Sequence, residues 1–187
     1  NIGKIFISVN YKKKLIKSHL KEAKNKNLFF LEEEKYLGSA GPLSLVKKKI
    51  NNDFFVINCD SIIKTNLKDF YIFHKNNNYD ITIVVSMKTF EFPYGSCKID
   101  KKGELIRIEE KPKYSNFSNV GLYLFKKKIL NLLKKNEPID MDKLIKTAKN
   151  KKLRIGVFPI DQDNWIDVGE WEKFKIQSGK KNFYDEY

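Results

Sequence analysis

Cysteine is scarce in this sequence of 187 residues, and the two that occur, Cys59 and Cys97, lie far apart. Their number and spacing exclude a disulfide framework and a metal site built from cysteine pairs. Both fall in apolar, strand-like stretches, so we expect two buried free thiols in a reducing cytoplasm. Histidine is equally rare, and His19 and His74 lie on predicted helices, where packing or surface roles suffice. We therefore expect no catalytic histidine.

Long hydrophobic runs are absent as well. No apolar stretch reaches the roughly 20 residues that cross a bilayer, and no signal-peptide pattern occurs, so we expect no membrane partner. Acidic residues are outnumbered by 37 basic residues to 23, which gives a net charge of +14. The lysines form short clusters on predicted solvent-facing helices and turns, which favours a solvated face over a nucleic-acid surface. The basic field would still attract a phosphorylated substrate.

Enough apolar material is present for one folded core, since hydrophobic residues make up 41% of the chain and aromatic residues 13%. We assign residues 1–179 to one domain and residues 180–187 to a tail. The chain begins with Asn1 rather than Met, and a buried strand at Ile5–Val9 follows at once. From this we expect that the beginning of the domain is missing.

Continuous apolar strands alternate with helices through the first half of the chain. We expect strands at 5–9, 28–31, 54–57 and 81–86, and helices at 12–24, from the turn at 37–42 to about 50, and at 67–76. We expect the first of these helices to be basic and amphipathic, with Leu15 and Ile16 on its apolar side. The order predicts an α/β fold, a Rossmann-like three-layer α/β/α arrangement with a mostly parallel mixed sheet.

The second half of the chain has a different pattern. We expect a hairpin of strands at 94–99 and 104–109, strands at 120–125 and 154–159, helices at 127–135, 141–149 and 170–177, and a turn at 165–169.

Acidic residues follow apolar strands at two places. Asp60 ends the run Asn58-Cys59-Asp60, and Asp167 lies within Trp165-Ile166-Asp167-Val168-Gly169. Open α/β folds bind ligands at the carboxyl ends of their strands, where a carboxylate can hold Mg²⁺ against a phosphate. The alternative for each acid is a capping role, with Trp165 as a core aromatic.

Small residues gather at Leu37-Gly38-Ser39-Ala40-Gly41-Pro42. They would let the backbone approach a flat ligand, and the following helix would aim its amide groups at an anion or a polar edge. The alternative is an ordinary strand-to-helix turn.

Three further segments combine polar side chains with glycine or proline. In Glu109-Glu110-Lys111-Pro112, the proline should hold Lys111 in an extended conformation, from which it could donate to a phosphate. An edge-strand ion pair is the alternative. Tyr94-Gly95 and Asn119-Val120-Gly121 each put a glycine where close approach would help.

In this order, the segments resemble those of the sugar-phosphate nucleotidyltransferase family, which includes mannose-1-phosphate guanylyltransferases and glucose-1-phosphate thymidylyltransferases. The resemblance runs to about Gln177. The segments that carry it are Leu-Gly-Ser-Ala-Gly at 37–41, Asn-Cys-Asp at 58–60, Tyr-Gly at 94–95, Glu-Lys-Pro at 110–112, Asn-Val-Gly at 119–121 and Trp-Ile-Asp-Val-Gly at 165–169.

The resemblance implies a role for each matching residue and makes residues 1–179 a catalytic domain. Asp60 and Asp167 would bind Mg²⁺, and Lys111 would grip the sugar phosphate. The residues that would bind the rest of the substrates are Gly38, Ser39, Ala40 and Gly41 at the nucleoside, and Tyr94, Gly95, Glu110, Asn119 and Gly121 at the sugar.

The implied reaction joins a nucleoside triphosphate to a sugar 1-phosphate in nucleotide-sugar synthesis, and it releases pyrophosphate. The form of the Leu-Gly-Ser-Ala-Gly loop favours GTP. The resemblance also implies a Gly-rich loop, earlier in the chain, that binds the triphosphate. The sequence printed here does not contain this loop, so we expect little activity from this chain alone, and we also expect low stability.

Other interpretations remain open. They are a GT-A type glycosyltransferase, a non-catalytic subunit of the same fold and, third, a nucleic-acid binder. The nucleobase, the sugar and a homo-oligomeric state are undecided by the sequence.

Overall fold

The computed structural model describes residues 3–22 and 26–169. The chain divides into two compact units. Unit 1 consists of Asn1–Phe54, Asn78–Ile81 and Phe125–Ile155, and unit 2 of Phe55–Asn77, Thr82–Leu124 and Gly156–Tyr187. Within the described ranges, no helix is both long and apolar enough to cross a membrane.

Unit 1 begins with a strand–helix–strand motif. Strands β1 (Ile5–Val9) and β2 (Leu28–Glu32) pair in parallel, with Ile5 opposite Leu28. Helix α1 (Lys13–Glu22) connects them, because parallel neighbours cannot be joined by a tight turn. Two 3₁₀ helices, η1 (Gly41–Val46) and η2 (Lys127–Leu132), and helix α3 (Met141–Asn150) complete the unit.

Two helices of unit 1 differ in type from the predicted ones, and the amphipathic helix α1 leaves its apolar side largely exposed, with Leu15 66% and Ile16 37% accessible. Helical periodicity identifies an apolar stripe but does not show that another element covers it. The helices expected to end near 50 and at 127–135 are instead the short 3₁₀ helices η1 and η2. In η1, Pro42 lies in the first turn, where its missing N–H costs nothing.

Unit 2 contains most of a four-stranded sheet in the order β3-β8-β5-β9. Its strands are β3 (Phe54–Ile57), β8 (Lys113–Phe125), β5 (Ile81–Glu91) and β9 (Ile155–Ile160). Helix α2 (Leu67–Asn76) has the bounds that the sequence predicts, and the Asn66 side chain caps it by accepting from the Lys68 N–H at 3.0 Å.

The core of unit 2 forms where α2 meets this sheet. Phe70 is fully buried and contacts Phe55 and Phe158, with ring centroids 5.9 and 5.3 Å apart. Val84 and residues of β8 complete the buried cluster, and Trp165 packs against it. Both β5 and β8 are buried in the halves that the apolar pattern predicted, and they continue as exposed strands beyond it.

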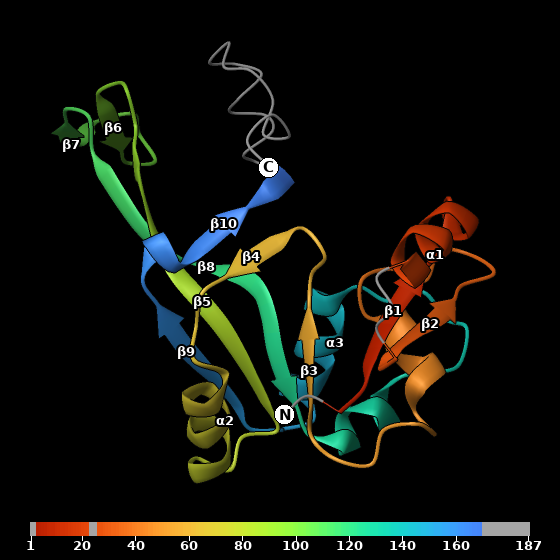
Figure 1. The fold of residues 1–187 in the computed structure, drawn as a ribbon. Helices are drawn as coiled ribbons and strands as arrows, with labels where there is room; N and C mark the ends of the chain where they lie inside the picture. Colours follow the sequence, from red (N-terminus) through yellow and green to blue (C-terminus); the bar gives the residue numbers. More distant parts are fainter. Residues whose placement is uncertain (1–2, 23–25, 170–187) are drawn as a thin grey trace. The chain divides into compact units, whose positions relative to one another are not determined.

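The predicted hairpin is confirmed as β6 (Ser96–Ile99) and β7 (Leu105–Glu109), at the end of the long strands β5 and β8 (Figure 1). The Asp100 carboxylate closes its turn by accepting the N–H groups of Lys102 and Glu104.

The expected turn at 165–169 begins as a strand. β10 (Trp165–Asp167) pairs antiparallel with β4 (Ser61–Ile63), beside which it lies in Figure 1. The predicted α/β class is confirmed, with both parallel and antiparallel pairs, but the described strands form four sheets rather than one. The predicted helix at 170–177 and the tail at 180–187 lie outside the described residues.

Candidate functional site

The two predicted acidic residues meet in unit 2 through the backbone of β4 and β10. Asp167 lies opposite Ser61 in the strand register, and the N–H of Val168 donates to the carbonyl oxygen of Asp60 at 2.9 Å. Asp60 is exposed and Asp167 is half-buried. One Asp167 oxygen accepts the Gly169 N–H at 3.0 Å, which orients the carboxylate. Residues 107 positions apart are therefore neighbours, as the sequence interpretation requires.

This donor set fits a magnesium ion. Mg²⁺ prefers oxygen ligands and is commonly held by one or two carboxylates together with substrate phosphates, not by a full protein cage. In the described part of the chain, no group of three or more His, Cys, Asp or Glu residues could hold a metal. Asp60 and Asp167 could supply such carboxylates from neighbouring segments, and their contact with a metal ion stays a prediction.

Gly121 joins the Asp60 turn to the strand that carries Asn119. It has a φ of +82°, and its carbonyl oxygen accepts the Asn58 N–H at 2.9 Å. The Asn58 side chain covers its α-carbon so closely that an added Cβ would lie 2.7 Å from Asn58 Cγ and Nδ2. Glycine is therefore required here both by backbone conformation and by space. The residue that contacts Gly121 is Asn58, to which the sequence analysis gave no role.

Asn119 is oriented by two hydrogen bonds. Its Oδ1 accepts the Gly121 N–H at 3.0 Å, and its Nδ2 donates to the Tyr123 hydroxyl at 2.6 Å. Burial raises the pKa of Tyr123, a shift that the bond from Asn119 partly offsets. The second N–H and the remaining lone pairs of the exposed amide stay available for a sugar hydroxyl.

The predicted sugar-binding residues Glu110 and Gly95 are brought together. A Cβ on Gly95 would lie 3.1 Å from Glu110 Oε2, so the missing side chain lets the carboxylate approach the backbone. Tyr94 is 69% exposed, and its ring stacks edge-on against Phe92 at 5.7 Å. These contacts place the Tyr94-Gly95 and Glu110 segments at one surface of unit 2.

Lys111 does not adopt the extended conformation that its proline neighbour predicted. Its φ is +46°, in the left-handed region, and its side chain is exposed. The chain bends at residues 110 and 111 between β7 and β8, and this bend overrides the local preference. Within the described residues, no hydrogen bond or ion pair joins Lys111 to Asp60 or Asp167. The contact of Lys111 with a phosphate therefore stays a prediction.

The small-residue loop at 37–41 lies in unit 1 and is packed against residues 137–141. The N–H groups of Ala40 and Gly41 donate to the Ile139 carbonyl oxygen at 3.0 and 3.1 Å, so they do not point at an anion as expected. Gly38 has a φ of +76°, and a Cβ there would lie 2.6 Å from the Ile139 oxygen. Ser39 is exposed, and its hydroxyl accepts the Met141 N–H. Internal packing alone explains these small residues, and their contact with a nucleoside stays a prediction.

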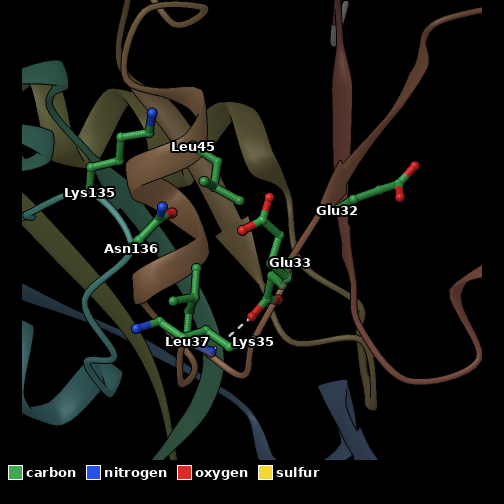
Figure 2. A pocket seen from close by; sticks show the side chains of 8 residues that line it. Glu32, Glu33, Lys35, Leu37, Leu45, Lys135 and Asn136 are labelled. Carbon is green, nitrogen blue, oxygen red and sulfur yellow. Dashed lines mark hydrogen bonds between the residues drawn. The ribbon is translucent and has the colours of Figure 1, made fainter.

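A pocket of about 420 Å³ opens beside this loop (Figure 2). Glu33 lines it and is only 8% exposed. Its carboxylate accepts the Leu37 N–H at 2.9 Å, drawn as the dashed line in Figure 2, and the Ser8 hydroxyl at 2.5 Å. Glu33 is not among the residues that the sequence analysis identifies, although a run of three glutamates two residues before the small-residue loop was a visible signal. The lining residues are Glu32, Glu33, Glu34, Lys35, Leu37, Leu45, Lys135 and Asn136.

Both cysteines are free, but they are exposed, so the expectation of buried thiols is wrong. Cys59 lies in the turn after β3, and Cys97 lies on a hairpin whose residues are mostly open to solvent. An apolar sequence context did not identify burial at either position. The cytoplasmic location stays a prediction.

Comparison with known proteins decides the family. Residues 1–180 match the profile of the family described as nucleotidyl transferase. The chain belongs to the nucleotidyl transferase family. Mannose-1-phosphate guanyltransferase 2 of Candida glabrata is 31% identical over 187 residues, which cover 94% of this chain and 51% of the relative. The catalytic subunit beta of mannose-1-phosphate guanylyltransferase from Drosophila pseudoobscura pseudoobscura is 29% identical over 179 residues, covering 91% and 47%.

Solved structures agree with this nucleotidyl transferase fold. HddC from Yersinia pseudotuberculosis superimposes with a TM-score of 0.67 at 24% identity, covering 96% of this chain and 80% of HddC. Its complex with GMP-PN gives a TM-score of 0.66 at 22% identity, with the same coverage. The predicted Rossmann-like nucleotidyltransferase fold is confirmed. The chain spans about half the length of the curated relatives it matches.

Proposed function

We propose that the whole protein transfers a nucleotidyl group from a nucleoside triphosphate to a sugar 1-phosphate, forming a nucleoside-diphosphate sugar and pyrophosphate. The observation that supports this proposal is the β4–β10 pairing, which brings the backbone segments of Asp60 and Asp167 side by side in unit 2. Membership of the nucleotidyl transferase family supports it over a glycosyltransferase or a nucleic-acid binder.

The proposed chemistry needs positioning and charge neutralisation more than proton transfer. An oxygen of the sugar phosphate attacks the α-phosphorus, and the bond from that phosphorus to the β-phosphate oxygen breaks. The attacking oxygen is already anionic, so no general base is needed. Mg²⁺, held by Asp60 and Asp167, would neutralise charge on the phosphates.

The remaining roles belong to side chains of unit 2. Glu110 and Asn119 would orient the sugar hydroxyls, and the hydrogen bonds that fix Asn119 reduce the entropy lost on binding. Lys111 would bind the sugar phosphate. Its left-handed backbone supports a role in binding, because strained residues cluster at ligand sites.

Guanine is the nucleobase that the pocket in unit 1 favours. Guanine presents two adjacent N–H donors, on N1 and N2, and a carboxylate can accept both. Glu33 offers such a carboxylate, buried and already oriented by Ser8 and Leu37, in a pocket within the size range of ligand sites. The relatives' names specify guanylyl transfer to mannose 1-phosphate, which supports GTP and mannose 1-phosphate as the first substrates to test.

A product assay tests the proposal. The whole protein should release pyrophosphate when given Mg²⁺, GTP and mannose 1-phosphate, and Asp167→Asn should reduce the rate by at least about tenfold. Release of free nucleoside diphosphate from a nucleotide sugar would indicate the glycosyltransferase instead. No pyrophosphate with any of the four common nucleoside triphosphates and a panel of hexose and heptose 1-phosphates would contradict transferase function.

A further inference from the structure

Lys88 makes an unusually close contact with the strand that carries Asp167. The Lys88 ammonium, on β5, lies 4.3 Å from the ring centroid of Trp165, on β10. Six other cation–ring contacts within the described residues have distances of 5.4 to 5.9 Å. Both side chains are half-buried, so water screens this attraction less than it screens an exposed one.

This contact lies on the same face of β10 as the acid. Successive side chains of a strand point to opposite faces, so Trp165 and Asp167 share a face and Ile166 lies on the other. Ile166 is 39% exposed, while the Trp165 ring packs against the buried core of unit 2. The lysine therefore meets β10 on the face that also bears the Asp167 carboxylate.

No hydrogen bond fixes the indole ring. Trp165 Nε1 is buried, and it has no hydrogen-bond partner within residues 3–22 and 26–169. Apolar packing holds the ring from the core side. The Lys88 ammonium adds a polar contact to a face of this ring, two residues before Asp167.

We propose that Lys88 is a positioning residue of the divalent-cation site. It acts through Trp165, holding the short strand β10 against β4 so that the Asp167 carboxylate lies beside Asp60. With three paired residues, β10 has little ladder of its own to fix it. The inference rests on the proposed function for the role of the two acids.

The test measures binding of Mn²⁺, which takes the same oxygen ligands as Mg²⁺. Electron paramagnetic resonance gives the free Mn²⁺ in titrations of the chain and its variants. Lys88→Met should weaken binding by roughly three- to tenfold, the range expected for loss of a partly buried cation–ring contact. Lys88→Arg should restore most of the affinity, because a guanidinium also stacks on an aromatic ring. Lys75→Met, which removes the lysine lying over Tyr71 on α2 of the same unit, is the matched control and should bind as wild type.

Tryptophan fluorescence supplies a second readout that needs neither metal nor activity. The sequence has two tryptophans, so Trp171→Phe leaves Trp165 as the sole emitter. In that background Lys88→Met should shift the emission, and Lys88→Arg should shift it less.

The outcomes separate this proposal from the proposed function. Wild-type affinity and unchanged emission in Lys88→Met would overturn the role of Lys88 alone. Absence of Mn²⁺ binding to wild type would overturn the metal site and this inference with it. A merely structural role predicts lower melting temperatures for Lys88→Met and Lys75→Met, with no change in the affinity of either folded protein for Mn²⁺, and would also overturn the inference.

Discussion

Replacing Gly121, in strand β8, with alanine should destabilise unit 2 strongly. The new Cβ would meet Asn58 Cγ and Nδ2 at 2.7 Å and Asn58 Cβ at 3.0 Å, on a backbone with a φ of +82°. The left-handed backbone costs a non-glycine residue roughly 1–2 kcal/mol, and overpacking adds about 1–3 kcal/mol. We therefore expect the free energy of unfolding to fall by about 2–5 kcal/mol.

Gly103 provides a matched control in the same unit. Its φ is +89°, and an added Cβ would have no atom within 4 Å, so Gly103→Ala measures backbone strain alone. Alanine also restricts the unfolded chain at both positions, an effect that cancels in the comparison. Urea unfolding followed by circular dichroism should show Gly121→Ala to be less stable than Gly103→Ala by about 1–3 kcal/mol.

A double variant tests the assigned contact. Asn58→Ala removes the amide atoms that the new Cβ would meet, so it should restore part of the stability lost in Gly121→Ala. Equal stability of Gly121→Ala and Gly103→Ala, or no recovery with Asn58→Ala, would refute the contact between the Asp60 turn and β8.

Three further predictions concern other parts of the molecule. Asp80→Asn should lower the free energy of unfolding at pH 7 by about 1.5–3 kcal/mol, because Asp80 is 5% exposed and bonds Lys126, Lys128 and the Arg154 N–H. Burial alone would raise the pKa of Asp80, but the Lys128, Arg154 and Lys126 bonds outweigh it and lower the pKa. The stabilisation by the Asp80 carboxylate is therefore present above its pKa in the unfolded chain and is lost as the pH falls through its pKa in the folded protein. Urea unfolding near pH 2–3 should thus show a smaller difference in stability between wild type and Asp80→Asn than at pH 7. A difference that does not change with pH would contradict the stabilising role of the ionised carboxylate. Lys111→Asn should raise the melting temperature slightly, because asparagine tolerates a left-handed backbone better than lysine does. The same change should weaken sugar-phosphate binding measured by calorimetry. A lower melting temperature would contradict backbone strain at Lys111. Both thiols should react with DTNB without denaturant, and Mg²⁺ with mannose 1-phosphate should protect Cys59 but not Cys97; a thiol that reacts only after unfolding would contradict its exposure.

The sequence predicted those parts of the fold in which burial and local pattern agree. Helix α2 and the buried halves of β5 and β8 were found because apolar residues mark them continuously. The exposed continuations of β5 and β8 escaped detection, since an apolar run identifies burial and not strand length. The three-residue strand β10 was too short to show an alternating pattern, so it was read as a turn.

The sequence predicted that the segments of Asp60 and Asp167 lie close together, but not by which contacts. The antiparallel pairing of β4 with β10 brings them together, and not the carboxyl ends of parallel strands as expected. The contacts of Asn58 with Gly121 and of Lys88 with Trp165 depend on packing between segments far apart in sequence. The left-handed backbone of Lys111 is likewise set by the path between two strands, which its own proline neighbour does not encode.

The account depends most on one divalent cation shared by two acids. Titration of Mn²⁺ into the chain, followed by electron paramagnetic resonance, should give one bound ion for wild type and at least about tenfold weaker binding for Asp60→Asn and for Asp167→Asn. The double variant should bind Mn²⁺ only slightly more weakly than the weaker-binding single variant, because the loss of either acid already disrupts the shared site. Normal Mn²⁺ binding in either single variant, or two independent ions each lost with one acid, would contradict the shared site.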